Sequence, residues 1–265
     1  SMKKFLVIGN PIEHSLSPEL HNYWIKNNNI NAIYEKQKLN KDQLKQFILK
    51  VKDNKINGIN ITVPFKKMVI PYLDELSAEA ESTQSVNTIY KKDNKVIGHN
   101  TDIFGFKASI EKAKYNVNNK EVLILGAGGV VPSIIFSLIK MKASKIKISN
   151  RTKEKAENLK KLFKNIEIIK WGEVSNFDII INATSVGLKK EDNLNLDFSS
   201  ASGNKFFYDV IYNPSETNFL KIGKKLGNET LNGKLMFIYQ AFSAFNIWHG
   251  LEPDIDKNVI KLLDQ

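Results

Sequence analysis

The sequence predicts two α/β domains, of which the second is built on a doubly wound parallel sheet. Short apolar runs of strand length alternate with amphipathic segments of helix length along nearly the whole chain, a pattern typical of α/β folds. One apolar run, residues 122–125, is followed directly by Gly126, Ala127, Gly128 and Gly129, then by a helix-like segment and another strand. This strand, glycine turn, helix and strand predict a βαβ unit.

The composition indicates an ordinary globular protein. The chain has 265 residues, with 42% hydrophobic and 25% charged side chains, which is enough for one large or two small domains. It contains no cysteine, so disulfides, thiolate nucleophiles and cysteine-ligated metals are excluded, and we expect no metal site. No apolar run reaches the ~18 residues of a membrane span, and no signal-peptide pattern is present. We therefore expect a cytoplasmic protein that does not bind membranes.

The net charge of +11 raises the question of a nucleic-acid partner. The positive charge is nearly all lysine, and it is spread along the chain in short pairs such as Lys66-Lys67 and Lys160-Lys161. No basic block is interleaved with aromatic residues to form a stacking surface. We expect no nucleic-acid partner, whereas small anionic ligands remain compatible with the charge.

In the N-terminal domain, two features at the ends of predicted elements carry candidate chemistry. Ser17 followed by Pro18 predicts a helix start with the serine as N-cap. Ser15 and Ser17 are two apart in an extended segment and can form a neutral clamp for a carboxylate, although capping alone would explain Ser17. Lys66 follows a strand whose carboxyl end is where open α/β sheets bind ligands; a solvated lysine is the simpler alternative. Strands are predicted at residues 5–8, 32–34, 56–63, 86–90 and 95–98, the last two as a hairpin, and helices at 42–52 and 74–84.

The remainder of the chain predicts the parallel sheet and its helices. We expect a connecting helix at residues 103–114 and a domain boundary close to Asp102, so that residues 1–101 and 236–265 form one domain and residues 102–235 the other. Polar turns at 182–187 and 209–214 follow two of the strands. The further strands are expected at residues 146–149, 166–169, 178–181 and 206–208, and the helices at 130–140, 153–163, 218–226, 235–248 and 254–263.

The glycine turn and the residues after the next strand predict a dinucleotide site. Gly126 allows a tight turn, Gly128 allows the backbone to approach a pyrophosphate, and Gly129 opens a helix whose N-terminus favours an anion. About 20 residues later, where NAD enzymes place an acidic residue, the chain has Arg151, its only arginine. A guanidinium suits the 2′-phosphate of NADP, and Lys155 can add charge. The alternative is a surface arginine at a strand end.

The order of the motifs and their amino-acid sequences closely resemble those of shikimate dehydrogenases. The resemblance covers nearly the whole chain and rests on nine motifs. These are 9–11 with 14–18 and 21–22, 60–66, 86–88, 98–102, 126–129, 150–152, 182–187, 209–214 and 233–240. It implies a Rossmann-type NADP-binding domain, a substrate domain and a cleft between them. It also implies the NADP-dependent reversible reduction of 3-dehydroshikimate to shikimate, a step of chorismate and aromatic amino-acid biosynthesis, by a monomer or homodimer.

The resemblance also implies individual roles. Ser15 and Ser17 would hold the substrate carboxylate, and Lys66 and Asp102 would be the catalytic acid/base pair. Further substrate contacts would come from Thr62, Asn87, Tyr212 and Gln240. The pyrophosphate would lie against residues 126–130, ending at Val130. The adenosine 2′-phosphate would be bound by Asn150, Arg151, Thr152 and Lys155, and the nicotinamide by Val210, Gly233 and Met236.

Two positions depart from the family pattern, and three other functions are open. The glycine turn continues with Val130 where alanine is usual, which would narrow the pyrophosphate site, and Lys234 replaces a small apolar residue. A quinate/shikimate dehydrogenase that uses NAD or NADP is one alternative; Arg151 argues against NAD. A metabolite sensor without catalysis is disfavoured by Lys66 and Asp102. A folate-linked dehydrogenase of similar layout is disfavoured by Ser15 and Ser17.

Overall fold

The computed structural model describes residues 1–264, and these form two compact units. The first unit comprises Ser1–Gly105 and Ile238–Leu263, and the second comprises Phe106–Phe237 and Asp264. The chain passes from one unit to the other inside two continuous helices, α4 (Asp102–Lys112) and α8 (Lys234–His249). The transitions therefore fall within helices, close to the residues at which the sequence predicts the domain boundaries.

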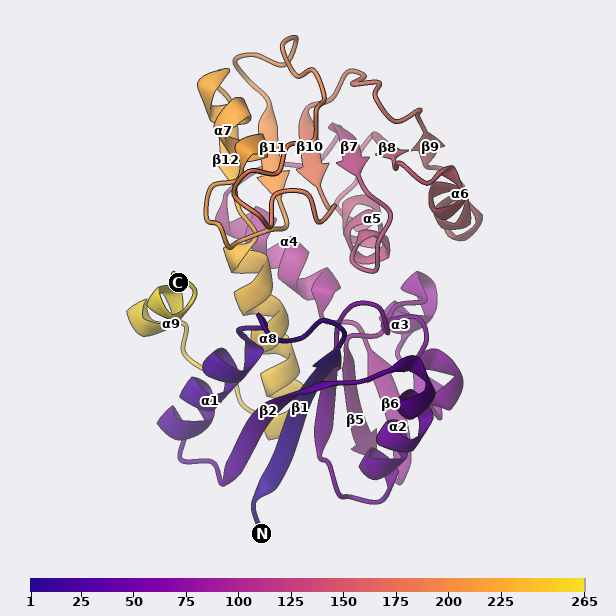
Figure 1. The fold of residues 1–265 in the computed structure, drawn as a ribbon, viewed down its shortest axis with the longest axis vertical. Coiled ribbons are helices and arrows are strands. Elements are labelled where there is room, and N and C mark those ends of the chain that lie inside the picture. Colours follow the sequence, from indigo (N-terminus) through magenta and orange to yellow (C-terminus); the bar gives the residue numbers. More distant parts are fainter. Residues whose placement is uncertain (265) are drawn as a thin grey trace. The chain divides into compact units, whose positions relative to one another are not determined.

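The first unit contains a mixed six-stranded sheet (Figure 1). The central strand pairs β1–β2 and β1–β3 are parallel, whereas β3–β5 and the predicted hairpin β5–β6 are antiparallel. In sheet order the strands are β2 (Ala32–Lys38), β1 (Lys3–Gly9), β3 (Gly58–Ile61), β5 (Thr88–Lys92), β6 (Lys95–His99) and β4 (Glu75–Leu76).

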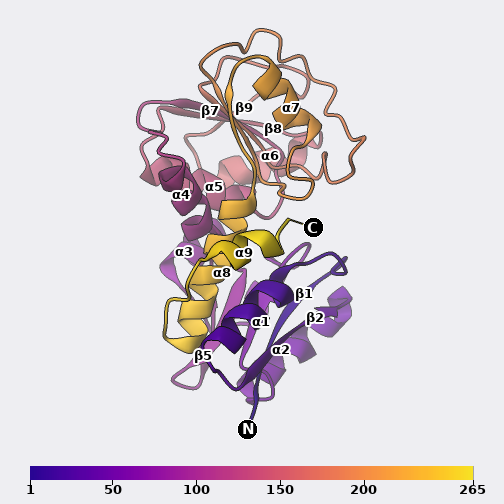
Figure 2. The same cartoon turned by 90° about the vertical axis from the view of Figure 1, so that its left-hand side faces the viewer.

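Alternate residues of β1 pack against helices on opposite faces of this sheet. Leu6 and Ile8 belong to a core cluster with Phe47 and Ile48 of α2. Phe5 faces the other way, because its ring lies 4.9 Å from that of Trp248 in α8. Helix α9 packs along α1, as Figure 2 shows. The helices of this unit are α1 (Ser17–Asn27), α2 (Leu44–Lys52), α3 (Ala78–Thr83), α9 (Lys257–Leu262) and the 3₁₀ turns η1 (Lys41–Gln43) and η2 (Ile70–Tyr72).

Three predicted boundaries in this unit are wrong. The segment 74–84 is not one helix: it begins with β4, and α3 starts only after Ser77, whose hydroxyl accepts a hydrogen bond from the backbone N–H of Ala80. The strand predicted to reach Val63 ends at Ile61, and Val63 is 59% exposed. The last helix begins at Lys257, because Asp256 caps it through the N–H groups of Asn258 and Val259.

The second unit contains six strands that are all parallel, which confirms the predicted doubly wound sheet. From β7 the chain proceeds outward to β8 and β9, then returns and continues from β10 on the other side of β7 (Figure 1). This is the Rossmann order, with its topological switch point between β7 and β10. In sheet order the strands are β12 (Glu229–Leu231), β11 (Phe206–Asp209), β10 (Ile179–Asn182), β7 (Glu121–Leu125), β8 (Lys145–Ser149) and β9 (Glu167–Ile168).

Helices cover both faces of the parallel sheet, and β7 again separates them by alternation. Val122 and Ile124 pack with α5 and α6, whereas Leu123 and Leu125 pack in a separate cluster with α7. Strand β12 was not predicted, because its three residues, Glu-Thr-Leu, carry no apolar run. The helices are α5 (Val131–Lys140), α6 (Lys153–Leu162) and α7 (Asn218–Lys225).

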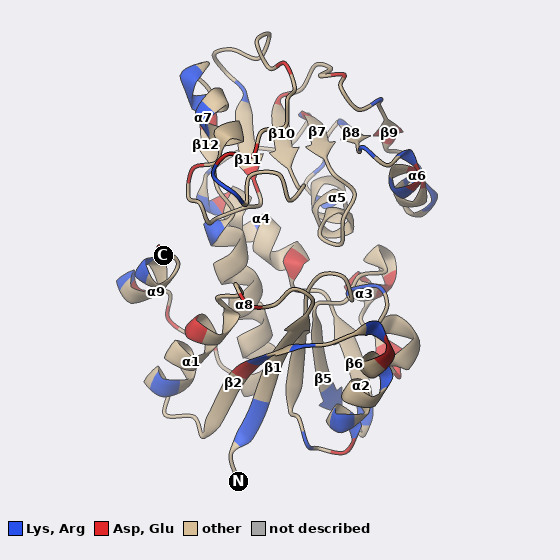
Figure 3. Ribbon diagram, in the orientation of Figure 1, with Lys and Arg blue, Asp and Glu red and all other residues tan. Residues whose placement is uncertain are grey.

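Charged side chains are dispersed over the elements of each unit. Figure 3 shows Lys and Arg on most helices and many loops, with Asp and Glu interspersed. No helix among residues 1–264 has the length and apolar character that crossing a membrane requires. Within the same residues, no group of His, Asp and Glu side chains is arranged to hold a metal ion.

Candidate functional site

Lys66 and Asp102 form a partly buried ion pair within the first unit. The Lys66 Nζ lies 2.7 Å from Asp102 Oδ2, and the two side chains are 14% and 9% exposed. Lys66 lies in the loop after β3, and Asp102 is the first residue of α4. The backbone carbonyl of Lys66 accepts a hydrogen bond from Val86 N–H at 2.8 Å, which ties the lysine loop to the segment before β5. The two predicted catalytic residues therefore lie in direct contact.

Asn87 follows Val86 in that segment and is almost completely buried, with 3% of its surface exposed. Its backbone pairs on both sides: its N–H donates to the carbonyl of His99 at 3.1 Å, and its carbonyl accepts from Ile61 N–H at 2.8 Å. Its side chain is held by Thr101, the residue directly before Asp102, through two hydrogen bonds. The predicted substrate residue is thus fixed by the same segment that carries the aspartate.

Ser17 is not the N-cap of α1, so that prediction is wrong. The helix begins at Ser17 itself, Leu16 occupies the capping position, and no side chain caps the helix. A hydroxyl already inside the first turn does not reach the N–H groups that an N-cap serves. Instead, the backbone N–H of Ser17 donates to Ser15 Oγ at 3.3 Å. The two serines therefore lie together, and helix capping does not explain the presence of Ser17.

Thr62 lies where the loops after β1 and β3 meet. Its backbone N–H donates to the carbonyl of Ile8 at 3.0 Å. A Cβ on Gly9 would lie 2.4 Å from Thr62 Cγ2 and 3.0 Å from the carbonyl oxygen of Val63. Only glycine therefore allows this close approach at the carboxyl ends of the two strands.

The glycine turn of the second unit fits a dinucleotide pyrophosphate. Gly126 has a φ of +109°, and a Cβ there would lie 2.9 Å from the carbonyl oxygen of Ala183, so glycine is required by the fold itself. Gly128 differs: a Cβ there would meet nothing within 4 Å. The protein leaves open space in front of Gly128, at the switch point between β7 and β10, where such sheets bind ligands.

Arg151 is exposed after β8, and its guanidinium lies over the ring of Trp171 at 5.2 Å. Such a cation–π contact holds the planar head group at one ring face while leaving its edges free. Asn150 donates from Nδ2 to the carbonyl of Thr152 at 2.8 Å, and Thr152 precedes α6, in which Lys155 is exposed. The structure thus presents the four predicted 2′-phosphate residues on one turn and the first turn of the following helix.

The predicted nicotinamide residues gather at the end of β11. A Cβ on Gly233 would lie only 1.9 Å from the carbonyl oxygen of Val210, so these two backbones touch. Met236 is 5% exposed and packs in the core cluster against which Val210 also packs. The carboxylate of Asp209, which accepts from Thr217 Oγ1 at 2.7 Å and from Ile211 N–H at 3.0 Å, anchors the turn. Burial raises the pKa of Asp209 to about 6.

The remaining candidates divide between the two units. Tyr212 lies in the second unit, where its ring packs at 4.8 Å from that of Phe237. Gln240 lies on α8 in the part of that helix that belongs to the first unit.

The two departures from the family pattern have local explanations. Val130 packs against the core cluster of the second unit, so its side chain is partly accommodated by that core. Lys234 forms an ion pair with Asp264, and its side chain is only 16% exposed. This lysine therefore binds the end of the chain to the start of α8, a pairing that no local sequence pattern indicates.

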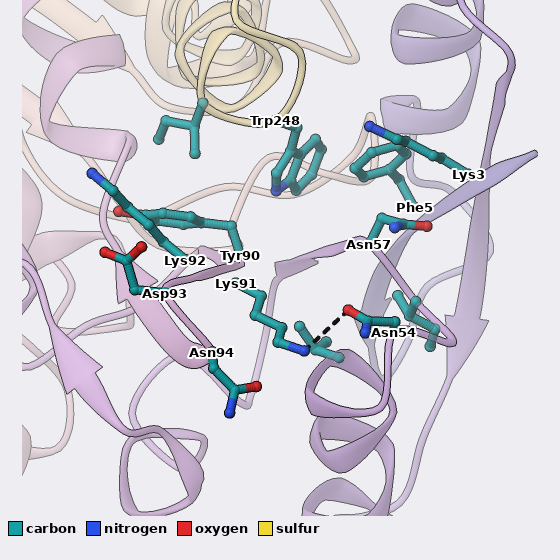
Figure 4. A pocket seen from close by; sticks show the side chains of 13 residues that line it. Lys3, Phe5, Asn54, Asn57, Tyr90, Lys91, Lys92, Asp93, Asn94 and Trp248 are labelled. Atoms are coloured by element: carbon teal, nitrogen blue, oxygen red, sulfur yellow. Dashed lines mark hydrogen bonds between the residues drawn. The ribbon is translucent and has the colours of Figure 1, made fainter.

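A pocket in the first unit lies away from all of these residues (Figure 4). It is lined by the start of β1 at Lys3 and Phe5, by the hairpin turn and by Trp248. Lys91 is held inside the unit, because its Nζ donates to Asn54 Oδ1 at 3.1 Å and to the carbonyl of Lys52 at 2.8 Å. None of the candidate residues lines this pocket, so we do not assign the substrate to it.

Comparisons with known proteins point to one family. Residues 7–89 match the family model described as the shikimate dehydrogenase substrate binding domain, and residues 108–210 match that described as shikimate / quinate 5-dehydrogenase. The curated shikimate dehydrogenase (NADP(+)) of Pelagibacter ubique (strain HTCC1062) is 64% identical over 262 residues, which cover 99% of each chain.

Solved structures agree with this finding. The shikimate dehydrogenase of Aquifex aeolicus is 37% identical and superposes with a TM-score of 0.89, over 99% of this chain and 97% of that one. The shikimate 5-dehydrogenase of Thermus thermophilus, solved in complex with NADP(H) and shikimate, is 28% identical with a TM-score of 0.89, over 99% and 98% of the two chains.

Proposed function

Because the chain belongs to the shikimate dehydrogenase family, we propose that it catalyses the NADP-dependent reversible reduction of 3-dehydroshikimate to shikimate. The resemblance predicted from the motifs is confirmed by the 64% identity over nearly the whole length of a curated relative. The single observation that supports the chemistry best is the contact between Lys66 and Asp102, at 2.7 Å and largely shielded from solvent. NADP is the cofactor, as for that relative, and the protein is an oxidoreductase.

Lys66 is the proton donor in this proposal. NADPH supplies the hydride, and the alkoxide that forms from the ketone needs a proton from a positioned acid. The Lys66 ammonium donates that proton to the substrate oxygen, and in the oxidation direction its amine accepts the proton back. Asp102 orients the lysine through the ion pair. Its Oδ1 is not part of that 2.7 Å contact and serves as the acceptor for a substrate hydroxyl.

The substrate is bound through hydroxyl and amide side chains in this proposal. Ser15 and Ser17 bind the carboxylate through neutral hydroxyls; the contact between Ser17 N–H and Ser15 Oγ supports a common binding surface. Thr62, Asn87, Tyr212 and Gln240 bind ring hydroxyls and the carboxylate. Residues 1–101 with 236–265 form the substrate domain, and residues 102–235 form the cofactor domain.

Cofactor binding is assigned to the second unit. Residues Gly126 to Val130 take the pyrophosphate, an assignment supported by the open space in front of Gly128. Arg151 binds the 2′-phosphate with Asn150, Thr152 and Lys155. Val210, Gly233 and Met236 line the nicotinamide.

We further propose a cytoplasmic monomer or homodimer without a nucleic-acid partner. The lysines support the last point, because they are spread over many elements with acidic residues interspersed (Figure 3).

A four-way assay tests the function. The absorbance of reduced nicotinamide is followed with shikimate or quinate and with NADP or NAD. We expect turnover with shikimate and NADP to exceed the other three combinations clearly. Equal or faster turnover of quinate, or a preference for NAD, would replace the proposal with the quinate/shikimate alternative. No turnover with any pair would favour the metabolite-sensor alternative.

A further inference from the structure

The carboxamide of Asn87 has only one group left for a ligand. Its Oδ1 accepts two hydrogen bonds, from Thr101 N–H at 2.7 Å and from Thr88 Oγ1 at 3.0 Å. Its Nδ2 donates to Thr101 Oγ1 at 2.8 Å. A carboxamide has two acceptor sites on oxygen and two N–H groups. Both acceptor sites are used, and one N–H remains.

The backbone N–H of Thr101 fixes which way round the Asn87 amide lies, and the Thr101 hydroxyl holds its Nδ2. The oxygen and nitrogen of an asparagine can exchange by a half-turn, but a backbone N–H can only donate. The Thr101 N–H therefore requires the amide oxygen, Oδ1, as its partner. The amide nitrogen, Nδ2, then faces the Thr101 hydroxyl oxygen and donates to it. Asn87 and Thr101 are 3% and 0% exposed, so no solvent competes for these bonds.

From these contacts we infer that Thr101 is a positioning residue that makes Asn87 a hydrogen-bond donor toward the substrate. This inference rests on the proposed function and deepens it. A substrate hydroxyl that accepts from Asn87 keeps its own proton to donate to a carboxylate, and Asp102 follows Thr101 directly in the chain. A hydroxyl satisfies both neighbours, whereas a carbonyl oxygen satisfies only the amide. Thr101 thereby helps to select a hydroxyl at this position of the substrate.

A buried relay supports the same orientation from the other side. Thr88 Oγ1 accepts from Asn60 Nδ2 at 3.1 Å, and Asn60 Oδ1 accepts from the Tyr34 hydroxyl at 2.7 Å. The Thr88 hydroxyl, which accepts from Asn60, donates to Asn87 Oδ1 at 3.0 Å, a shorter contact than the 3.4 Å between Thr88 Oγ1 and Thr101 Oγ1. Thr88 is 0% exposed and Asn60 is 6% exposed. Both acceptor sites of Asn87 Oδ1 are thus filled by buried donors, the Thr101 N–H and the Thr88 hydroxyl.

The test is the isosteric variant Thr101→Val, which keeps the backbone N–H and replaces the hydroxyl by a methyl group. Without the Thr101 hydroxyl, Nδ2 of Asn87 is no longer held in place, and loss of its hydrogen bond to the substrate lowers affinity by up to about tenfold. We expect the KM for shikimate and its calorimetric Kd to rise by that factor, with kcat and the KM for NADP within about threefold of wild type. Thr101→Ser, which restores the hydroxyl, should return both constants to near wild type. In an Asn87→Ala background, Thr101→Val should have no further effect.

A purely structural role would give a different result. Tyr23→Phe removes a hydroxyl of the same unit that bonds Asp256 at 2.6 Å and touches no candidate residue; it should leave the KM unchanged. Monodeoxy analogues of shikimate provide the second control: for the one that lacks the hydroxyl bound by Asn87, wild type and Thr101→Val should bind equally. If Thr101→Val does not fold, Thr88→Val tests the same amide from its oxygen side. The inference would be overturned if the Thr101→Val or Thr88→Val enzyme kept the wild-type KM and Kd for shikimate. It would also be overturned if the variant lost the same factor in affinity for every analogue. An inactive wild type would instead refute the proposed function.

Discussion

Replacing Lys66 by alanine removes the nitrogen that carries the proton while leaving the rest of the site in place. The lysine contributes its side chain from a loop, and the backbone carbonyl of Lys66, which accepts from Val86 N–H, is unaffected by the substitution. The variant also removes the ammonium group whose Nζ lies 2.7 Å from Asp102 Oδ2. Two effects are therefore expected, one on turnover and one on the stability of the folded protein.

The two effects differ in size. Loss of a positioned acid lowers turnover by on the order of 10²–10⁴-fold, which corresponds to about 3–5 kcal/mol in the barrier. Removing one partner of a fully buried ion pair costs about 3–5 kcal/mol of stability. Here the cost should be smaller, because the side chains are 14% and 9% exposed and water can reach Asp102. A domain stable by ~5–15 kcal/mol remains folded, so the activity loss reports on chemistry.

The assay compares kcat and KM for shikimate in wild type, Lys66→Ala and Lys67→Ala. Lys67 is the matched control, because it is the next residue and is exposed. We expect kcat to fall by the factor above for Lys66→Ala only, with KM within about threefold. Urea unfolding of each variant confirms that the protein is folded. If Lys66→Ala retains wild-type kcat and loses only affinity, Lys66 binds substrate and does not transfer the proton.

Three further predictions follow from single contacts. Arg151→Ala should raise the KM for NADP by about 10–100-fold, since a hydrogen bond to a charged group contributes ~1.5–3 kcal/mol. The KM for NAD should stay nearly unchanged. An equal rise in KM for both cofactors would refute the 2′-phosphate role. Gly128→Ala should weaken NADP binding without lowering the urea midpoint of unfolding. Gly233→Ala should lower that midpoint, because its Cβ would lie 1.9 Å from the Val210 oxygen. The reverse pattern would contradict both the ligand role of Gly128 and the structural role of Gly233. Burial, with the charge of His249, lowers the pKa of His21 from 6.5 to about 3. The unfolded chain therefore takes up this proton first, and stability should fall by up to ~1.4 kcal/mol per pH unit from pH 6.5 toward pH 3. In His21→Phe the urea midpoint should depend less on pH over this range, and an unchanged slope would contradict the assignment.

Local patterns in the sequence were sufficient for the features that depend on backbone geometry. The glycine turn after residues 122–125 predicted a βαβ unit, and Gly126 indeed requires its positive φ. The alternation of apolar residues predicted strands such as β1 and β7, whose successive side chains pack on opposite faces. Such features are determined by residues close together in the chain, so they can be predicted from a single sequence.

Features that depend on partners distant in the chain were not predictable in this way. Ser17 followed by Pro18 has the composition of a helix cap, but the helix begins at Ser17 itself and Leu16 occupies the capping position. Lys234 pairs with Asp264, which lies far from it in the sequence. Trp171, which lies well beyond Arg151 in the chain, carried no motif of its own. Pairings of this kind are set by the fold and not by local spacing.

One short segment, residues 100–103, positions two functional groups of the proposed catalytic side. Asp102 and Thr101 are adjacent, and each holds a different group: Asp102 holds the Lys66 ammonium and Thr101 holds the Asn87 amide. A shift of this segment would therefore displace the proton donor and a substrate donor together. The same segment starts α4, where the N–H of Ile103 donates to Asn100 Oδ1 at 3.2 Å. The start of the helix thus fixes both groups at once, and their relative geometry is maintained within a single compact unit.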